Sequence, residues 1–371
     1  MFANSPFSKP HKLRPAICPW LLAAAWLALV APPASAGKRV LQPPWAFQCT
    51  FESAHLPAVH ADIEEVFQHG MYLMHRRGRT TLLETQISEF NEVARYLRVA
   101  HSHGHPKAGW YLVDWLFVLV DQEPDGLASP LRRTRAKEVE RVIAQMIERR
   151  LPDGYLRRGG FAEQSWNLQQ ALDDYRRAAD LGSPEAQSKL ADWLEGRSIM
   201  AKVVDVADRR TRSLATTLYR CAAQQGHAPS ITVLAKELLK QKAFSQALPM
   251  LQRAVAAGSA EAAYTLVQVF SGEPQGYRPF RTLAAKPDAA RAERYERIRM
   301  FLIGHEADRN ALPDLERIVP LPPASLPEWA GAFQWDLERR PVPVQPKEVL
   351  MQRLCREKAL DPATGLPLGV R

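Results

Sequence analysis

The sequence predicts an all-α protein: a right-handed superhelix of stacked helical hairpins, followed by an irregular proline-rich C-terminal region. One reason is a helix–turn–helix pattern centred on Gly182, and a second is its recurrence around Gly104, Gly226 and Gly258. Composition is a third reason: of the 371 residues, 46% are apolar and 24% are charged, which excludes a wholly disordered chain. The net charge of +9 arises from mixed signs, which is not the charge density of a nucleic-acid-binding protein.

Residues 1–36 have the pattern of a secretory signal peptide. A basic region precedes the apolar run 21–31, and Ala34-Ser35-Ala36 then supplies a small-x-small cleavage sequence. The run is too short to cross a hydrocarbon core of about 30 Å at about 1.5 Å per residue, although an uncleaved anchor is the alternative. We expect the mature protein to be exported to the periplasm, without a membrane span.

Residues 37–60 are expected to form an extended N-terminal segment. Because Cys18 lies in the signal peptide, the mature chain retains Cys49, Cys221 and Cys355. This odd count permits at most one intramolecular disulfide. A Cys49–Cys355 clamp between the two ends of the chain is one alternative, and three free thiols, which we favour, are the other.

The clearest hairpin pattern lies between residues 171 and 196. Ala171, Tyr175 and Ala178 are spaced by four and then three residues, so they share one face of a helix, where alanines let a second helix approach closely. Gly182 can adopt the left-handed conformation that ends this helix, and Ser183-Pro184 supplies the N-cap and the first-turn proline of the next. Such a hairpin cannot bury its apolar stripe alone, so hairpins must stack.

Three further stretches repeat these columns when their glycines are aligned: 93–117, 215–239 and 247–272. Gly104 and Gly182 are 78 residues apart, which leaves room for one degenerate unit. We expect the helices of that unit at 137–151 and 163–172, with 154–160 as the loop between them.

The pattern A-L-x-x-Y-R-R-A-A-x-x-G-x-x-E-A-Q-x-x-L-A resembles the SEL-one-like repeats, which are relatives of the tetratricopeptide repeats. The resemblance is close over 171–196, weaker in the other units, and covers most of 90–275. It implies a repeat solenoid, to which we assign residues 61–275.

Residues 276–371 form a C-terminal region with a different composition. Helices are expected at 288–303 and 347–360, the latter before turn residues 361–365. Between them, prolines block a helix over 318–329, so we expect extended backbone whose interleaved Leu and Trp side chains hold it on a surface. The stretches VPLPPASLPEW and LDPATG resemble an uncharacterised C-terminal region that accompanies SEL-one-like repeats in some exported bacterial proteins.

Catalytic motifs are missing from the sequence. There is no Gly-x-Ser-x-Gly elbow or phosphate-binding glycine loop, and Arg309 replaces the second histidine that a zinc-protease motif would place after His305. His101, His103 and His105 alternate around the Gly104 turn, and we interpret them as solvated turn residues rather than metal ligands. We therefore expect no enzymatic activity, no bound metal and no cofactor.

Two basic groups are candidates for partner binding. The first is a column of the repeat alignment that stacking would bring into a row: Arg98, Arg176, Arg220 and Gln252. The second is a run in the degenerate unit: Arg132, Arg133, Arg135, Lys137 and Arg141. We interpret the groups as solvated helix faces with local ion pairs; the functional alternative is a surface for an acidic protein, lipid head groups or a wall polymer. The tryptophans of the repeats are assigned to the core: Trp110, Trp115 and Trp193.

These patterns favour a non-enzymatic periplasmic scaffold that binds another protein through a preformed curved surface. Resemblance to repeat proteins encoded beside secreted antibacterial effectors suggests an immunity protein that occludes a type VI secretion toxin. An envelope adaptor and an enzyme acting on cell-wall or lipid material are the alternatives. The absence of a nucleophile–base or metal constellation argues against the enzyme.

Overall fold

A computed structural model describes residues 46–76, 83–120, 130–197, 209–272, 285–305, 311–335 and 342–369 of the chain. Within these ranges there are fourteen α-helices and no β-strand, apart from an isolated bridge between Leu360 and Pro367. The predicted all-α solenoid is confirmed. The predicted signal peptide, residues 1–36, lies outside the described residues.

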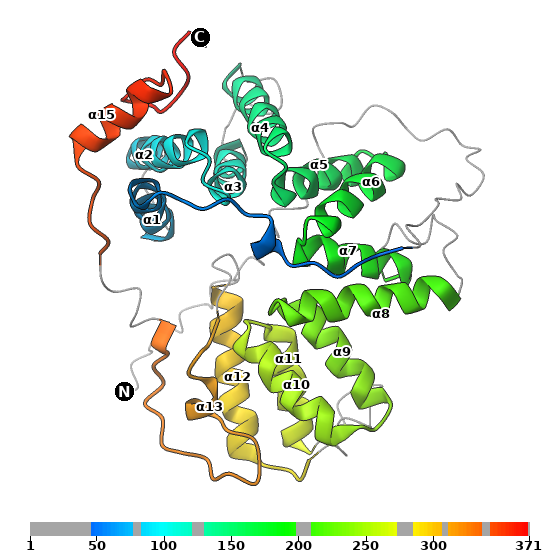
Figure 1. The fold of residues 1–371 in the computed structure, drawn as a ribbon. Helices are drawn as coiled ribbons and strands as arrows, with labels where there is room; N and C mark the ends of the chain where they lie inside the picture. Colours follow the sequence, from blue (N-terminus) through cyan, green and yellow to red (C-terminus); the bar gives the residue numbers. More distant parts are fainter. Residues whose placement is uncertain are drawn as a thin grey trace, which may run out of the picture.

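The body of the protein is a succession of helical hairpins, each packed on the next along the chain (Figure 1). Helix α1 (Ala61–Arg76) precedes five hairpins: α2 (Leu83–Ser102) with α3 (Ala108–Val120), α4 (Pro130–Glu148) with α5 (Pro152–Gln164), α6 (Leu168–Asp180) with α7 (Pro184–Leu194), α8 (Arg209–Gln224) with α9 (Ala228–Lys240), and α10 (Phe244–Ala256) with α11 (Ala260–Ser271).

The turn chemistry predicted around Gly182 is present. Gly182 has a φ of 86°, and the Ser183 side chain accepts a hydrogen bond from the Ala186 amide at the start of α7. The aligned glycines Gly104, Gly226 and Gly258 also have positive φ. This left-handed conformation is costly for residues with a Cβ, so the repeated glycine allows the repeated turn.

Small residues line the seams between the helices. Ala171, Ala178 and Ala186 are completely buried, and Tyr175 fills the space between them. The same columns are buried in the later hairpins, at Ala215, Ala222, Ala247, Ala254 and Ala262. Close approach of the helix backbones therefore holds the stack together, as the sequence predicted.

The predicted loop at 154–160 is wrong, because these residues lie inside α5. The chain instead turns around Arg150 and Trp166, two non-glycine residues with φ of 56° and 59°. Gly154 and Gly159 instead allow α5 to pack closely against its neighbours. A Cβ on Gly154 would lie 2.7 Å from the Cβ of Met146, and one on Gly159 would lie 2.7 Å from Cε1 of Tyr175. Only glycine lets α5 sit this close to its neighbours.

Hydrogen bonds from two buried tyrosines connect consecutive hairpins. The Tyr175 hydroxyl on α6 donates to Glu163 on α5 over 2.6 Å, and the Tyr219 hydroxyl on α8 donates to Asp192 on α7 over 2.6 Å. Burial, reinforced by these carboxylates, raises the pKa of both phenols well above the ordinary value of 10.0. Burial likewise raises the pKa of the Asp192 carboxyl.

The C-terminal region contacts both ends of the solenoid. Helix α12 (Ala289–Gly304) packs on α11, and residues 311–335, which include α13 (Leu315–Ile318), cover α10 and α12 with their apolar side chains. Helix α15 (Glu348–Glu357) lies at the opposite end, against α2 (Figure 1). The predicted C-terminal helices and the surface-bound proline-rich stretch are confirmed.

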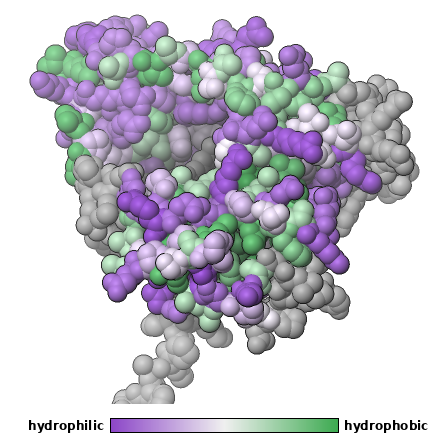
Figure 2. All heavy atoms as spheres, turned by 60° about the horizontal axis from the view of Figure 1, so that its bottom comes forward, coloured by the Kyte–Doolittle hydropathy of each residue, from purple (hydrophilic) through white to green (hydrophobic). Residues whose placement is uncertain are grey.

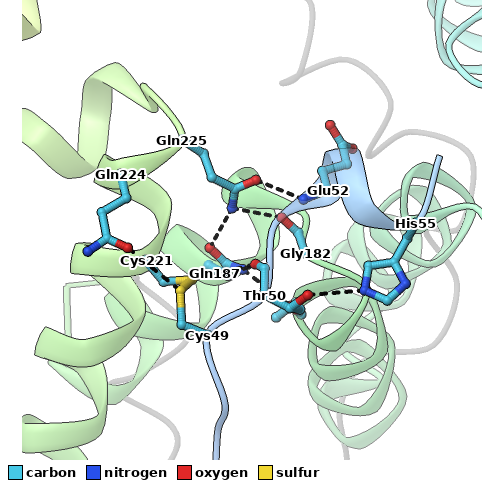
Figure 3. Close-up of a disulfide and its surroundings, with 10 residues drawn as sticks. Cys49, Thr50, Glu52, His55, Gly182, Gln187, Cys221, Gln224 and Gln225 are labelled. Carbon is cyan, nitrogen blue, oxygen red and sulfur yellow. Dashed lines mark hydrogen bonds between the residues drawn. A yellow bond between two sulfur atoms is a disulfide. The ribbon is translucent and has the colours of Figure 1, made fainter.

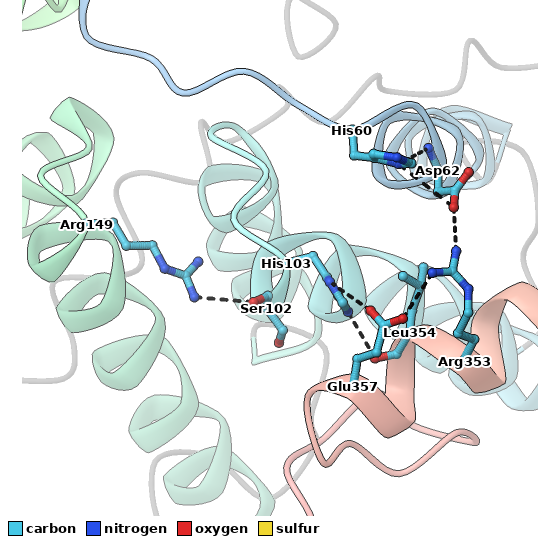
Figure 4. A network of polar contacts seen from close by, with 8 residues as sticks. All are labelled: His60, Asp62, Ser102, His103, Arg149, Arg353, Leu354 and Glu357. Atoms are coloured by element: carbon cyan, nitrogen blue, oxygen red, sulfur yellow. Dashed lines mark hydrogen bonds and ion pairs between the residues drawn. The ribbon is translucent and has the colours of Figure 1, made fainter.

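Polar contacts fix α15 at that end (Figure 4). The Arg95 guanidinium pairs with Glu348 over 2.8 Å. In Figure 4, His103 is hydrogen-bonded to the Leu354 carbonyl over 3.0 Å. Arg353 pairs with Asp62 of α1 and with Glu357. Met351 and Leu354 are buried beneath these contacts, so α15 extends the core of the first hairpin.

Replacing Ala178 with leucine tests the alanine seam. Ala178→Leu introduces three carbons where no space exists, and we expect it to lower the free energy of unfolding by about 1–3 kcal/mol in urea denaturation. Gln169→Leu adds the same side chain at an exposed position of α6 and should change stability by less than about 0.5 kcal/mol. Equal effects of the two substitutions would show that the seam is not close-packed.

The tyrosine contacts predict a loss of stability in alkali. Tyrosines of the unfolded chain ionise near pH 10, whereas Tyr175 and Tyr219 stay protonated in the folded chain, so stability should fall as the pH rises above about 10. Melting temperatures measured between about pH 9 and 11 check this. Removing both phenols, by Tyr175→Phe and Tyr219→Phe, should make the decline shallower, and an unchanged slope would contradict the assignment.

Candidate partner-binding groove

An N-terminal strap, defined here as residues 46–60, runs in an extended path along the edge formed by the hairpin turns (Figure 1). Its only helical residues are the short turn Glu52–Ala54. The Thr50 carbonyl accepts a hydrogen bond from Gln187 on α7 over 3.0 Å, and the Glu52 amide donates to Gln225 over 2.8 Å (Figure 3). The strap therefore bridges the hairpin α6–α7 and the hairpin α8–α9.

Charge holds the next part of the strap. The Lys107 ammonium lies 2.7 Å from the Glu52 carboxylate and 3.2 Å from that of Asp153 at the start of α5. Burial alone would lower the pKa of Lys107, but the two carboxylates outweigh it and raise that pKa. This charged group ties the strap to the turns of the first two hairpins.

Gly182 has a second structural role beneath the strap. A Cβ at this position would lie 2.3 Å from the carbonyl carbon of Phe51. The glycine that ends α6 thus also permits the backbone of the strap to cross directly over the turn.

A disulfide between Cys49 and Cys221 fastens the strap to α8 (Figure 3), with the two Cα atoms 5.6 Å apart. Both sequence alternatives, a Cys49–Cys355 clamp and three free thiols, are therefore wrong. The physical reason is the path of the strap, which passes α8, whereas Cys355 is buried in α15 at the other end of the solenoid. Burial raises the pKa of the Cys355 thiol.

The strap, α6 and α8 enclose an open groove of about 1140 Å³. One wall is strap backbone and side chains, and the other walls are the exposed faces of the two helices. The lining residues are Ala46, Phe47, Gln48, Cys49, Thr50, His55, Arg176, Asp180, Ser213, Leu214 and Thr217. The lining is therefore mixed, about equally polar and apolar, with Phe47 and Leu214 among the apolar contacts.

Of the predicted partner-binding residues, Arg176 lines this groove and Arg220 lies beside it. Arg176 lines it, pairs with Asp180 over 2.6 Å and donates a hydrogen bond to the Ala46 carbonyl of the strap. Arg220 is exposed on α8, three residues beyond the lining residue Thr217, which places it on the same helix face.

The other two residues of the predicted row hold the C-terminal region. Arg98 forms a two-pronged ion pair with Glu138, over 2.6 and 2.9 Å, and donates to the Thr364 carbonyl. Gln252 is 2% exposed; it donates to the Val319 carbonyl over 2.8 Å and accepts a hydrogen bond from Tyr295. The structure thus places Arg176 in the groove and Arg220 beside it, whereas Arg98 and Gln252 make contacts within the protein.

The histidines of the first turn are not solvated, contrary to the sequence interpretation. His101 is buried beside Gln145, and burial lowers its pKa to about 4, so it is neutral at pH 7. His105 is buried, stacks on Phe67 with ring centroids 3.8 Å apart, and contacts Glu64. Packing by α1, α4 and α15 around this turn explains the difference. No group of side chains suited to a metal ion occurs among the described residues.

The basic run of α4 is only partly solvated. Arg133 and Lys137 are exposed as expected, but Arg132 and Arg135 are buried, and the Arg135 guanidinium lies over the Phe90 ring at 5.3 Å. This run therefore contributes to the packing of α4 on α2. The tryptophans assigned to the core, Trp110, Trp115 and Trp193, are all buried, which confirms that prediction.

Hydrophilic residues dominate the face seen in Figure 2, and hydrophobic residues occur there in small groups between them. No helix in the described part of the chain has the length and apolar character needed to cross a membrane. Sequence reasoning missed the lining residues contributed by the strap, such as Gln48 and His55, because their position depends on the disulfide rather than on any local pattern.

The fold and groove define a helical-repeat protein in which a strap, fixed by a disulfide, crosses the edge formed by the hairpin turns. Residues 262–368 match a family described as a domain of unknown function (DUF6396). No curated protein matches the chain.

Two solved structures from Pseudomonas aeruginosa share the fold. They are PA5086, with a TM-score of 0.53, and the immunity protein PA5088, with a TM-score of 0.52. Each is 22% identical to this chain, and the similarity covers 75% of this chain and 95% and 94%, respectively, of the two relatives.

Removing the disulfide should loosen the strap. We expect the double substitution Cys49→Ala and Cys221→Ala to lower the free energy of unfolding by about 2–4 kcal/mol, because the 172-residue separation no longer constrains the unfolded chain. Hydrogen exchange of residues 46–52 should also accelerate. The matched control is Cys355→Ala, which should leave exchange in the strap unchanged. Equal exchange in oxidised and reduced wild-type protein would contradict the role given to this disulfide.

Proposed function

We propose that this protein is a non-enzymatic immunity protein of the periplasm, which binds a toxic partner protein and blocks its action. We also infer that its hairpins are SEL-one-like repeats and that residues 1–36 direct export. The observation that carries the proposal is the solenoid fold shared with the immunity protein PA5088 over 75% of this chain. An open groove of mixed polar and apolar lining on that fold supplies a preformed surface for a partner.

The disulfide supports the proposed compartment. Structural disulfides persist in the periplasm and are rare in a reducing cytoplasm. Cys49 belongs to the strap that forms one wall of the groove. The groove is therefore held in one shape only in a compartment where the Cys49–Cys221 disulfide can form.

A protection assay tests the proposal. A candidate toxin encoded beside this chain is directed to the periplasm of sensitive cells, and survival is counted with and without this protein. We expect the full chain to restore viability and a variant lacking residues 1–36 to fail, because it stays in the cytoplasm. Survival that does not depend on this protein would refute the immunity role for that toxin.

The same purified chain distinguishes the alternative functions. Turnover of wall fragments or lipids by the purified protein would favour an enzyme. Stable binding to an envelope protein, without protection of sensitive cells, would favour an envelope adaptor instead.

A further inference from the structure

Helix α8 carries basic residues of one sign beside the groove. Its sequence, RRTRSLATTLYRCAAQ, contains four arginines and no acidic residue. Ser213, Thr217 and Arg220 are exposed and follow one another by four and three residues, so they form one helix face, with exposed Arg212 beside it. Within the described residues, neither the Arg212 nor the Arg220 guanidinium has an ion-pair partner.

The other walls of the groove do not cancel this charge. Asp180 is the carboxylate among the lining residues, and it is already paired with Arg176. Glu52, the acidic residue of the strap nearest the disulfide, points to Lys107. The charges of the lining itself therefore balance, and the excess positive charge comes from Arg212 and Arg220, which lie on α8 beside the lining residues Ser213 and Thr217.

We propose that the groove binds an extended, acidic segment of the partner protein. Carboxylates of that segment would pair with Arg212 and Arg220, while Ser213, Thr217 and Gln48 offer hydrogen bonds to its main chain. Phe47 and Leu214 would receive an apolar side chain between the acidic ones. This inference rests on the proposed function, because it specifies the chemistry of the partner at the same groove.

A protein segment suits the groove better than a lipid surface does. Membrane-surface binding needs exposed apolar anchors beside the basic residues. Among the large exposed apolar side chains of the described residues, Phe51 is the one on the strap and none is on α6 or α8; the others lie on different elements, as at Trp166, Met300 and Val349. The groove instead combines guanidinium, hydroxyl and amide groups, which match the carboxylates and amides of a polypeptide.

Exposed arginine–carboxylate pairs are individually weak, and their main effects are steering of the encounter and selection of the partner. Binding should therefore depend on salt and on the charge of α8. Binding should depend much less on the net charge of the whole protein. Substitutions of the same charge at a distant position can test this difference.

Labelled synthetic peptides provide the test. An acidic peptide and its equal-length amide counterpart, with glutamine and asparagine replacing glutamate and aspartate, are titrated against the mature oxidised protein. We expect only the acidic peptide to bind, with affinity lowered at least about ten-fold by Arg212→Glu together with Arg220→Glu. The control pair Arg356→Glu and Lys358→Glu, which are exposed at the end of α15, imposes the same charge change and should leave affinity unaltered.

Three outcomes would overturn the inference: equal binding of the two peptides, no effect of the α8 substitutions, or binding of anionic lipid vesicles in place of the acidic peptide. Circular dichroism and melting of each variant exclude unfolding as the cause. Failure here, combined with protection of sensitive cells by the wild-type chain, would reject the acidic segment but keep the immunity role. Peptide binding without protection of sensitive cells would keep the acidic segment but reject the immunity role.

Discussion

Close approach of neighbouring helices through small residues is the constraint on which the structure depends. A helical hairpin has one apolar stripe and no sheet to cover it, so the stripe must be buried against the next hairpin. Alanines such as Ala171 and Ala178 bring the helix backbones together, and Gly154 and Gly159 do so where even a methyl group would collide. Tyr175 and Tyr219 then add one directional hydrogen bond each, across the α5–α6 and α7–α8 seams.

The N-terminal strap and the C-terminal region cover the parts of the stack that no neighbouring hairpin covers. A solenoid exposes its turn edge and both of its ends, and here the strap crosses the edge while the C-terminal region covers the ends. The segment that matches a family description, 262–368, is therefore not a separate body. It contributes α11 and α12 to one end of the solenoid and α15 to the other.

The groove is a product of the same arrangement. Its walls come from residues 46–55, from α6 and from α8, which are distant in the sequence and are joined by the Cys49–Cys221 bond. A surface fixed in this way loses little conformational entropy when a partner binds, which favours recognition by a rigid scaffold. Arg98 and Gln252 occupy equivalent repeat positions but contact the C-terminal region, so one repeat column performs different tasks along the stack.

Local sequence determined the four hairpins that turn at Gly104, Gly182, Gly226 and Gly258, because helix periodicity and glycine turns act between residues close in the chain. It also determined the helices α12 and α15 and the extended proline-rich stretch. Tertiary structure alone decided the disulfide partner of Cys49, the burial of His101 and the placement of Gly154 within a helix. Each of these depends on which distant element lies alongside, and no short-range pattern encodes that proximity.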